Sequence, residues 1–361
     1  MTKEKEIESN YRILYEQERE AHKKTKIKLG VKERELHTIT QSNSYKIAKL
    51  LALTKHAIRL TVNQVKRANP KYAGLIRANK RHVEAIYNSR DFIEQFPKNK
   101  TAQLAVVIHL YYVDTLPIFD RKLKRLKDVD FDLFVTIPEG KEFAVEDVKK
   151  AFPHANTMIV PNCGRDVLPF VEVAKQLNSL GYEKVLKLHS KKSPHRQDGS
   201  KWRDRILDSL IPSDKTVLNE ISKSLDNKNV AIIGPQGEYV SLLVNYEATG
   251  HYIEKFFTKI ISDTKIPRII DVSDEYGFFA GTMFWARLDA LMPVIDAVDS
   301  RDFEPEMGQV DSTLAHALER LLCLIPELHN RKMLEMKNDK VVEVNYHTTN
   351  IPEWSEIALK D

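Results

Sequence analysis

The sequence predicts an α/β fold with a mainly parallel sheet, preceded by a helical N-terminal region. Two observations carry this prediction. From about residue 101, apolar runs of strand length alternate with stretches of helix length, an order typical of βαβ units. Residues 1–40 instead are rich in Lys and Glu and nearly free of Gly and Pro. With 361 residues, 42% of them hydrophobic, the chain is long enough for one large domain and an appendage.

Residues 1–40 have the apolar spacing of a helix. Their apolar residues recur at three, four or seven positions, although Gly30 interrupts the pattern. They are Ile7, Tyr11, Leu14, Ala21, Leu29 and Leu36. A short coiled coil is the prediction, and it could either form a homo-oligomer or hold the following domain in a larger complex. A solvated single helix or a disordered N-terminus is the alternative.

Residues 41–98 predict a basic amphipathic helical segment. Between Leu36 and Val83 there are ten Lys and Arg and no Asp or Glu. Such a helix suits the anionic face of a membrane, or it packs its apolar side on the following domain. Nucleic acid is the least favoured partner, because no aromatic residues interleave with the cations. Residues 96–100 are the expected linker, so the predicted domains are 1–40, 41–98 and 99–361.

The C-terminal domain is expected to contain six strands between residues 104 and 287. Helices are expected from the first strand to about residue 125, then over 145–152 and 168–181, where Gly181 ends the last of them. The expected strands are 104–112, 131–137, 155–162, 182–190, 230–235 and 278–287. In a parallel sheet of this kind the ligand binds beyond the carboxyl ends of the strands.

Polar residues follow several of these strand ends. Tyr111, Tyr112 and Asp114 follow the first strand, and the segment "PNCGRDVLPF" follows the third. The fourth strand runs directly into "HSKKSPHR". Lys191, Lys192 and Arg196, with neighbouring serines, could bind a diphosphate, whereas an exposed basic loop is the simpler alternative.

Several function classes are not supported. The chain has no Gly-rich dinucleotide motif, no P-loop, no G-x-S-x-G and no H-E-x-x-H. Its two cysteines are far apart, which indicates reduced thiols rather than a disulfide or a zinc site. No apolar run reaches membrane-spanning length, and the N-terminus lacks a signal-peptide pattern. A cytoplasmic protein is therefore expected, and its net charge of +5 does not by itself indicate nucleic acid.

Five stretches from about residue 103 to 330 resemble the rhamnan synthesis F family of bacterial polysaccharide glycosyltransferases. They are "NCGRDVLPF", "KVLKLHSKKSPHR", "WRDRILDSLIPS", "GFFAGTMFWARLDAL" and "EMGQVDSTLAHALERLL". The resemblance implies a GT-A-like nucleotide-sugar transferase fold of Rossmann type. In that fold the fourth strand usually ends in a metal-binding Asp-x-Asp, but here the same place reads His189-Ser190-Lys191. Fixed cations are therefore expected to replace the metal, so no cofactor is firmly implied, although a divalent cation stays an option.

The resemblance also implies roles for individual residues. Asn162, Gly164, Arg165 and Asp166 would bind the donor, together with His189 and the three cations of the basic loop. For Arg165 and Asp166, a local ion pair at a helix start is the alternative. The acceptor would lie against Gly281, Thr282, Trp285 and Gln309, and Trp285 is equally well explained as a core residue.

An inverting transferase needs a general base for the acceptor hydroxyl. Asp311 and Glu306, in the loop before a helix that runs through Leu322, are the candidates. Asp311 could instead be the N-cap of that helix. His316 is expected to pack or to support the site rather than to act in catalysis.

The predicted function is transfer of a sugar, with inversion, to a growing lipid-linked cell-surface polysaccharide at the inner face of the plasma membrane. The resemblance favours dTDP-rhamnose as donor, which would make the protein a rhamnosyltransferase. A non-catalytic scaffold that retains the same fold is the alternative, because the Asp-x-Asp pair is absent.

Overall fold

The computed structural model describes residues 70–190, 199–242, 246–261, 276–307, 309 and 312–344. These belong to a compact unit that begins at Pro70. Its helices are α3 (Pro70–Tyr87), α4 (Arg90–Glu94), α5 (Leu116–Leu123), α6 (Ala144–Ala151), α7 (Val167–Ser179), α8 (Gly199–Leu210), α9 (Lys215–Asp226), α10 (Tyr246–Ile260), α12 (Leu288–Ala297) and α13 (Leu314–Leu328). Short 3-10 helices occupy η1 (Val113–Thr115), η2 (Lys124–Leu126) and η3 (Ser300–Asp302).

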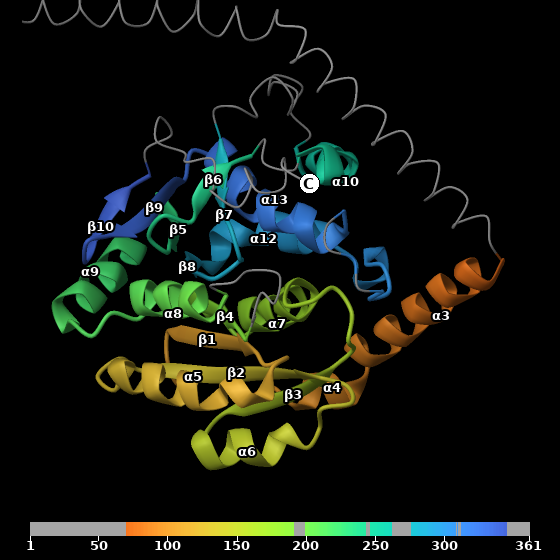
Figure 1. Ribbon diagram of the computed structural model, residues 1–361, viewed down its shortest axis with the longest axis horizontal. Helices are drawn as coiled ribbons and strands as arrows, with labels where there is room; N and C mark the ends of the chain where they lie inside the picture. The colour runs from red at the N-terminus through yellow and green to blue at the C-terminus, as the bar shows by residue number, and fades with distance from the viewer. Residues whose placement is uncertain are drawn as a thin grey trace, which may run out of the picture. The chain divides into compact units, whose positions relative to one another are not determined.

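An eight-stranded mixed sheet forms the centre of this unit, with the strand order β10-β9-β5-β8-β4-β1-β2-β3 (Figure 1). Its strands are β1 (Leu104–His109), β2 (Phe131–Pro138), β3 (Asn156–Val160), β4 (Lys184–His189), β5 (Val230–Gly234), β8 (Phe284–Arg287), β9 (Lys332–Lys337) and β10 (Lys340–Glu343). β3, β2, β1 and β4 are mutually parallel, whereas β8 runs antiparallel to both β4 and β5. The fold is therefore α/β and Rossmann-like, as expected.

The central strands are apolar enough to be buried on both faces of the sheet. Every residue of β1 and of β5 is buried. One core packs α7, α12 and α13 on one face of the sheet, and a second core packs α5, α8 and α9 on the other. Burial on both faces accounts for the nearly continuous apolar runs of the parallel strands.

The chain order reverses between β1 and β4. β2 and β3 follow β1 on one side, and β4 then returns to the other side of β1. The two strands are in register, so that their last residues, His109 and His189, are paired. Such a reversal opens a crevice beyond the carboxyl ends of the strands, which is where α/β proteins bind ligands.

One strand prediction is wrong. The stretch 278–287 is not one strand but two, β7 (Gly277–Phe279) and β8, and β7 pairs with β6 (Tyr239–Ser241) in a separate small sheet. The intervening turn has left-handed backbone at Gly281 (φ 92°) and Thr282 (φ 48°). Both halves are apolar and buried, so they read as one strand, and Gly281 is the local sign of the turn between them.

The predicted coiled coil over 1–40 and the basic segment up to residue 69 lie outside the described residues. The rest of the basic segment is mainly α3, which packs Val83 and Tyr87 into the core and contacts η3. For this part, packing on the following domain is the alternative that the structure supports. No described helix has the length and hydropathy needed to cross a membrane.

Candidate functional site

The site lies where the loops after β1, β3 and β4 meet. The backbone N–H of Ser190, just after β4, donates to the carbonyl of His109 at 3.0 Å. The Ser190 hydroxyl in turn accepts the N–H of Tyr112 at 2.8 Å. These two bonds connect the loops across the point where the chain order reverses.

An ion pair between β4 and the loop after β3 forms the centre of the site. The ammonium of Lys187 contacts Asp166 Oδ2 at 2.5 Å and the carbonyl of Thr282 at 2.8 Å. The Thr282 hydroxyl donates to the same carboxylate oxygen at 2.8 Å. The Lys187 side chain is 1% exposed and that of Asp166 is 15% exposed. A charged lysine in the middle of a buried strand is rare without such a partner.

Asp166 is held as a carboxylate. Burial by itself raises its pKa, but the charges of His189 and Lys187 and the hydrogen bonds from Lys187 and Thr282 act in the opposite direction. Their combined effect lowers the pKa well below its usual range. The alternative of a local ion pair between Arg165 and Asp166 is therefore wrong, because Asp166 pairs with Lys187, 21 positions along the chain.

His189 completes this group of charged residues. Its Nε2 lies 2.5 Å from the carbonyl of Gly281 and 3.9 Å from Asp166 Oδ2. A carbonyl can only accept, so Nε2 carries the proton. Lys187 and His189 alternate along β4 and thus point to the same face of the sheet.

Two of the connecting loops have a strained backbone. Arg165 has a φ of 57° and Thr282 a φ of 48°, values that non-glycine residues seldom adopt. Each follows a glycine with positive φ, Gly164 and Gly281. A Cβ on Gly164 would lie 2.5 Å from the Cβ of Leu168, so a side chain there does not fit. Strain of this kind tends to gather at functional sites, which supports a functional role for these turns.

Arg165 connects the loop after β3 to the loop before α13. Its guanidinium donates to the Gln309 carbonyl and lies 3.0 Å from Nε2 of His316. Since arginine is only a donor, His316 accepts at Nε2. Its Nδ1 lies 2.7 Å from the Thr313 hydroxyl and accepts the Thr313 backbone N–H at 3.4 Å. These contacts hold the two loops together through Arg165, and the supporting role of His316 stays a prediction.

Glu306 lies beside this connection. Its Oε2 is 4.0 Å from Nε of Arg165, and its side chain is 24% exposed. Burial raises the pKa of Glu306, and nearby Glu304 adds to this effect, while the charge of Arg165 and the backbone amides of Arg165 and Gly164 oppose it. The result is a pKa above the ordinary value, which makes the carboxylate a stronger base.

The remaining expected site residues lie in different environments. Asn162 is exposed at the start of the loop after β3. Gln309 stabilises its own loop by donating to the Pro305 carbonyl and accepting from the Met307 amide, both at 2.8 Å. Gly281 and Thr282 lie beside Asp166 and His189 rather than apart from them. Lys191, Lys192, Arg196 and Asp311 lie outside the described residues.

Two expectations need correction. Trp285 is 4% exposed within the core, and its indole N–H donates to the Leu210 carbonyl at 2.7 Å. It is a packing residue, because its position on β8 directs the ring into the layer under α8 rather than toward a ligand. The N-cap of α13 is Thr313, not Asp311.

Sequence reasoning missed Lys187 and His109. Lys187 stands within a mainly apolar strand. Its position two residues before His189 indicates that the two side chains share one face of the sheet, and this spacing could have identified it. His109 is 6% exposed at the end of β1 and lies 3.0 Å, through Nδ1, from the Thr136 hydroxyl. Burial lowers the pKa of His109 from 6.5 to about 3; Asp166 opposes this, and His189, Lys187 and Lys141 reinforce it.

We expect His109 to make stability depend on pH. In the unfolded chain His109 becomes protonated near pH 6.5, whereas in the folded protein it stays neutral down to about pH 3. The free energy of unfolding therefore decreases as the pH falls through this window. The loss is about 1.4 kcal/mol per pH unit. Urea unfolding at pH 7 and pH 5.5 should show His109→Gln losing less stability on acidification than the unmodified protein. The exposed His154→Gln is the matched control, and equal pH dependence in all three proteins would contradict the prediction.

The described residues do not fit a divalent cation. No group of three or more His, Cys, Asp or Glu within the described ranges could hold a metal ion. Asp166, the carboxylate beside the end of β4, already has its Oδ2 engaged by the Lys187 ammonium and the Thr282 hydroxyl. A metal there would face a buried positive charge, which is unfavourable.

Comparison with known proteins places this chain in a family. The family described as Rhamnan synthesis protein F matches residues 30–330. Two curated proteins from strains of Xanthomonas campestris pv. campestris, both described as "Uncharacterized protein WxcX", are 32% identical over 225 residues. That match covers 61% of this chain but only 30% of each relative. Because the family match covers well over half of the chain, including the loops after β1, β3 and β4, the chain belongs to the rhamnan synthesis protein F family.

Proposed function

We propose that this protein is a nucleotide-sugar-dependent glycosyltransferase of polysaccharide biosynthesis with a GT-A-like site. The reaction is inverting, the favoured donor is dTDP-rhamnose, and the acceptor is a lipid-linked glycan at the inner face of the plasma membrane. The family membership supports a role in rhamnan-type polysaccharide synthesis. The finer assignments rest on the chemistry of the site.

The observation that supports this proposal most directly is the buried set of fixed charges at the end of β4. Lys187 and His189 occupy alternate positions of the strand whose end would carry Asp-x-Asp in a metal-dependent enzyme. Asp166 and Thr282 hold these two side chains from the neighbouring loops. The strand then leads into the basic loop, where Lys191, Lys192 and Arg196 are proposed to bind the diphosphate. Fixed cations stabilise the developing charge of a phosphate leaving group, as a metal does elsewhere.

The proposed reaction is a single displacement. The acceptor hydroxyl attacks the anomeric carbon, the bond from that carbon to the diphosphate oxygen breaks, and the diphosphate leaves with the electron pair. The proton of the acceptor hydroxyl passes to a carboxylate that acts as general base. Glu306 is the first candidate for this base and Asp311 is the second. Attack from the face opposite the leaving group inverts the anomeric centre. Gly281, Thr282 and Gln309 lie on the loops that would border the acceptor.

Donor binding tests this proposal. We expect ligand-observed NMR on the full chain to detect binding of one nucleotide sugar among dTDP-rhamnose, UDP-sugars and GDP-sugars. Chelator should not abolish this binding, whereas Lys191→Ala should weaken it. Binding that requires a divalent cation would contradict the fixed-cation account. The absence of binding to every nucleotide sugar would contradict the transferase and favour a non-catalytic scaffold.

A further inference from the structure

α3 is fixed to the domain beside the candidate site. Its Val83 and Tyr87 side chains are 0% and 4% exposed in the core. The Asn79 amide donates to Cys163 Sγ at 3.5 Å, directly before the Gly164–Arg165 turn. His82 Nε2 lies 2.7 Å from Glu139, which follows β2. α3 therefore lies along the carboxyl ends of β2 and β3, the same edge of the sheet as the site.

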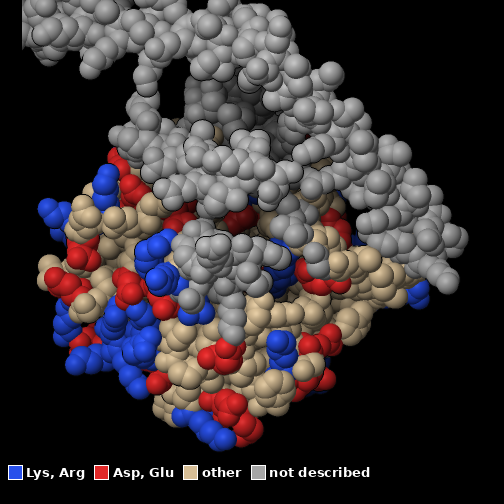
Figure 2. Space-filling model, viewed as in Figure 1, with Lys and Arg blue, Asp and Glu red and all other residues tan. Residues whose placement is uncertain are grey.

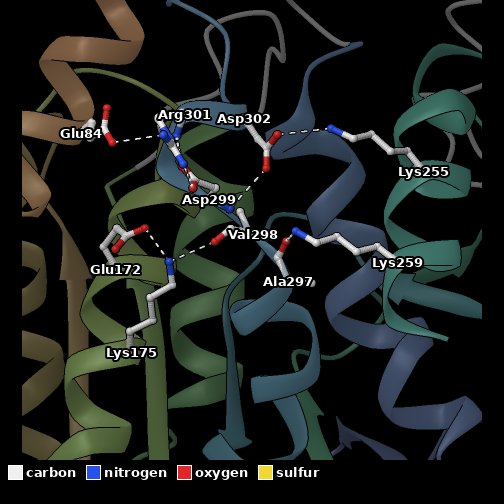
Figure 3. Close-up of polar contacts among 10 residues, drawn as sticks. All are labelled: Glu84, Glu172, Lys175, Lys255, Lys259, Ala297, Val298, Asp299, Arg301 and Asp302. Atoms are coloured by element: carbon white, nitrogen blue, oxygen red, sulfur yellow. Dashed lines mark hydrogen bonds and ion pairs between the residues drawn. The ribbon is translucent and has the colours of Figure 1, made fainter. Parts of the chain in front are cut away.

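The C-terminal part of α3 is joined to η3 by a balanced group of charges (Figure 3). Glu84 pairs with Arg301 at 3.2 Å, and Arg301 also pairs with Asp299 at 2.7 Å. The group contains four acids and four cations. They are Glu84, Glu172, Asp299 and Asp302, and Lys175, Lys255, Lys259 and Arg301. The ion-pair partner of Glu84 is therefore Arg301 of η3.

Three other cations of α3 form a stripe that points to solvent. Arg77, Lys80 and Arg81 are exposed, and their spacing of three and four residues places them on one helix face. Within the described ranges none of them forms an ion pair with an acidic side chain. The stripe continues the acid-free composition that begins at Leu36.

Apolar side chains are exposed at the same edge. Tyr111 follows β1, Phe143 follows β2 and Met307 lies in the loop that carries Glu306, with exposed fractions of 36%, 68% and 53%. Leu75 on α3 is 46% exposed. Cations together with protruding apolar side chains are the composition that attaches proteins to an anionic bilayer, whereas phosphates of nucleic acid need only the cations.

We propose that the Arg77–Lys80–Arg81 stripe of α3 docks on an anionic lipid surface and places the edge of the site next to that surface. The purpose of this docking rests on the proposed function: an acceptor that is linked to a lipid would reach the site once the site lies next to the lipid surface. The docking itself does not depend on catalysis. It requires only that α3 stays fixed to the loops that it contacts.

Vesicle sedimentation with the full chain tests the docking. The vesicles contain phosphatidylcholine with or without about one third phosphatidylglycerol. One variant combines Arg77→Gln, Lys80→Gln and Arg81→Gln. The matched control combines Arg121→Gln, Lys127→Gln and Lys223→Gln, three exposed cations of the α5, η2 and α9 region, where Lys and Arg gather in the view of Figure 2. A cation near an anionic leaflet contributes about fivefold to binding, so the α3 variant should bind at least tenfold more weakly.

The outcomes separate the alternatives. The control should retain binding within about twofold, and pure phosphatidylcholine should bind little of any protein. Equal loss in both variants would overturn the proposal, because net charge alone would then explain attachment. Unchanged lipid binding in the α3 variant would also overturn it, as would loss of duplex DNA binding without loss of lipid binding. Nucleotide-sugar binding of the α3 variant should equal that of the unmodified protein, so a failure of docking and a failure of the proposed function are distinguishable.

Discussion

Replacing Glu306 with Gln is expected to lower the turnover of sugar transfer by about 10²- to 10⁴-fold while leaving donor binding intact. Gln keeps the size and polarity of Glu306 but cannot accept the proton of the acceptor hydroxyl. The pKa of this carboxyl is raised, first by burial, so the carboxylate is a better base than an exposed one. The measurement is product formation at saturating donor, with donor affinity followed separately by ligand-observed NMR.

The control for this experiment is Glu146→Gln, which removes one exposed carboxylate from α6. It should retain full turnover. Asp311→Asn is the competing variant. Retained turnover in Glu306→Gln together with loss in Asp311→Asn would assign the base to Asp311 and contradict our prediction.

Replacing Lys187 with Met is expected to destabilise the protein by about 3–5 kcal/mol, because the Asp166 carboxylate loses its ammonium partner in a buried site. The Lys187 side chain is 1% exposed and the pair is 2.5 Å apart, so solvent cannot replace the lost charge. The free energy of unfolding in urea is the measurement. The exposed pair Arg90–Glu94, with 87% and 56% exposed side chains, is the control, and Arg90→Ala should change stability by less than about 1 kcal/mol.

A double variant makes this prediction sharper. Adding Asp166→Asn to Lys187→Met removes the unpaired charge and should recover part of the lost stability. Independent, additive losses would show that the two side chains do not act as a pair. The low pKa of Asp166 also sets a pH window. The stability that the Asp166 carboxylate contributes is complete above pH 3.8, its ordinary pKa, and is lost as the pH falls through its lower pKa in the folded protein.

The sequence by itself determined the order of the elements in the first half of the sheet. Strands over 104–112, 131–137, 155–162 and 182–190 were expected; β1, β3 and β4 lie within those ranges, and β2 extends one residue past its range, to Pro138. Periodicity and apolar runs are local properties, so they are readable from neighbouring residues alone. The same order indicated which loops follow strand ends, and it therefore placed Arg165, Asp166 and His189 at one edge of the sheet.

Only the tertiary structure decided which side chains meet there. Lys187 pairs with Asp166 because α7, which starts directly after Asp166, packs against β1, the neighbour of β4. The turn at Thr282, 95 residues downstream of Lys187, adds a carbonyl to Lys187 and a hydroxyl to Asp166. No local pattern encodes such contacts. Strands that are buried on both faces also lack the alternation that would separate a core residue from a ligand-facing one. For this reason Trp285 was open to either reading in the sequence, and only its place under α8 showed that it packs in the core.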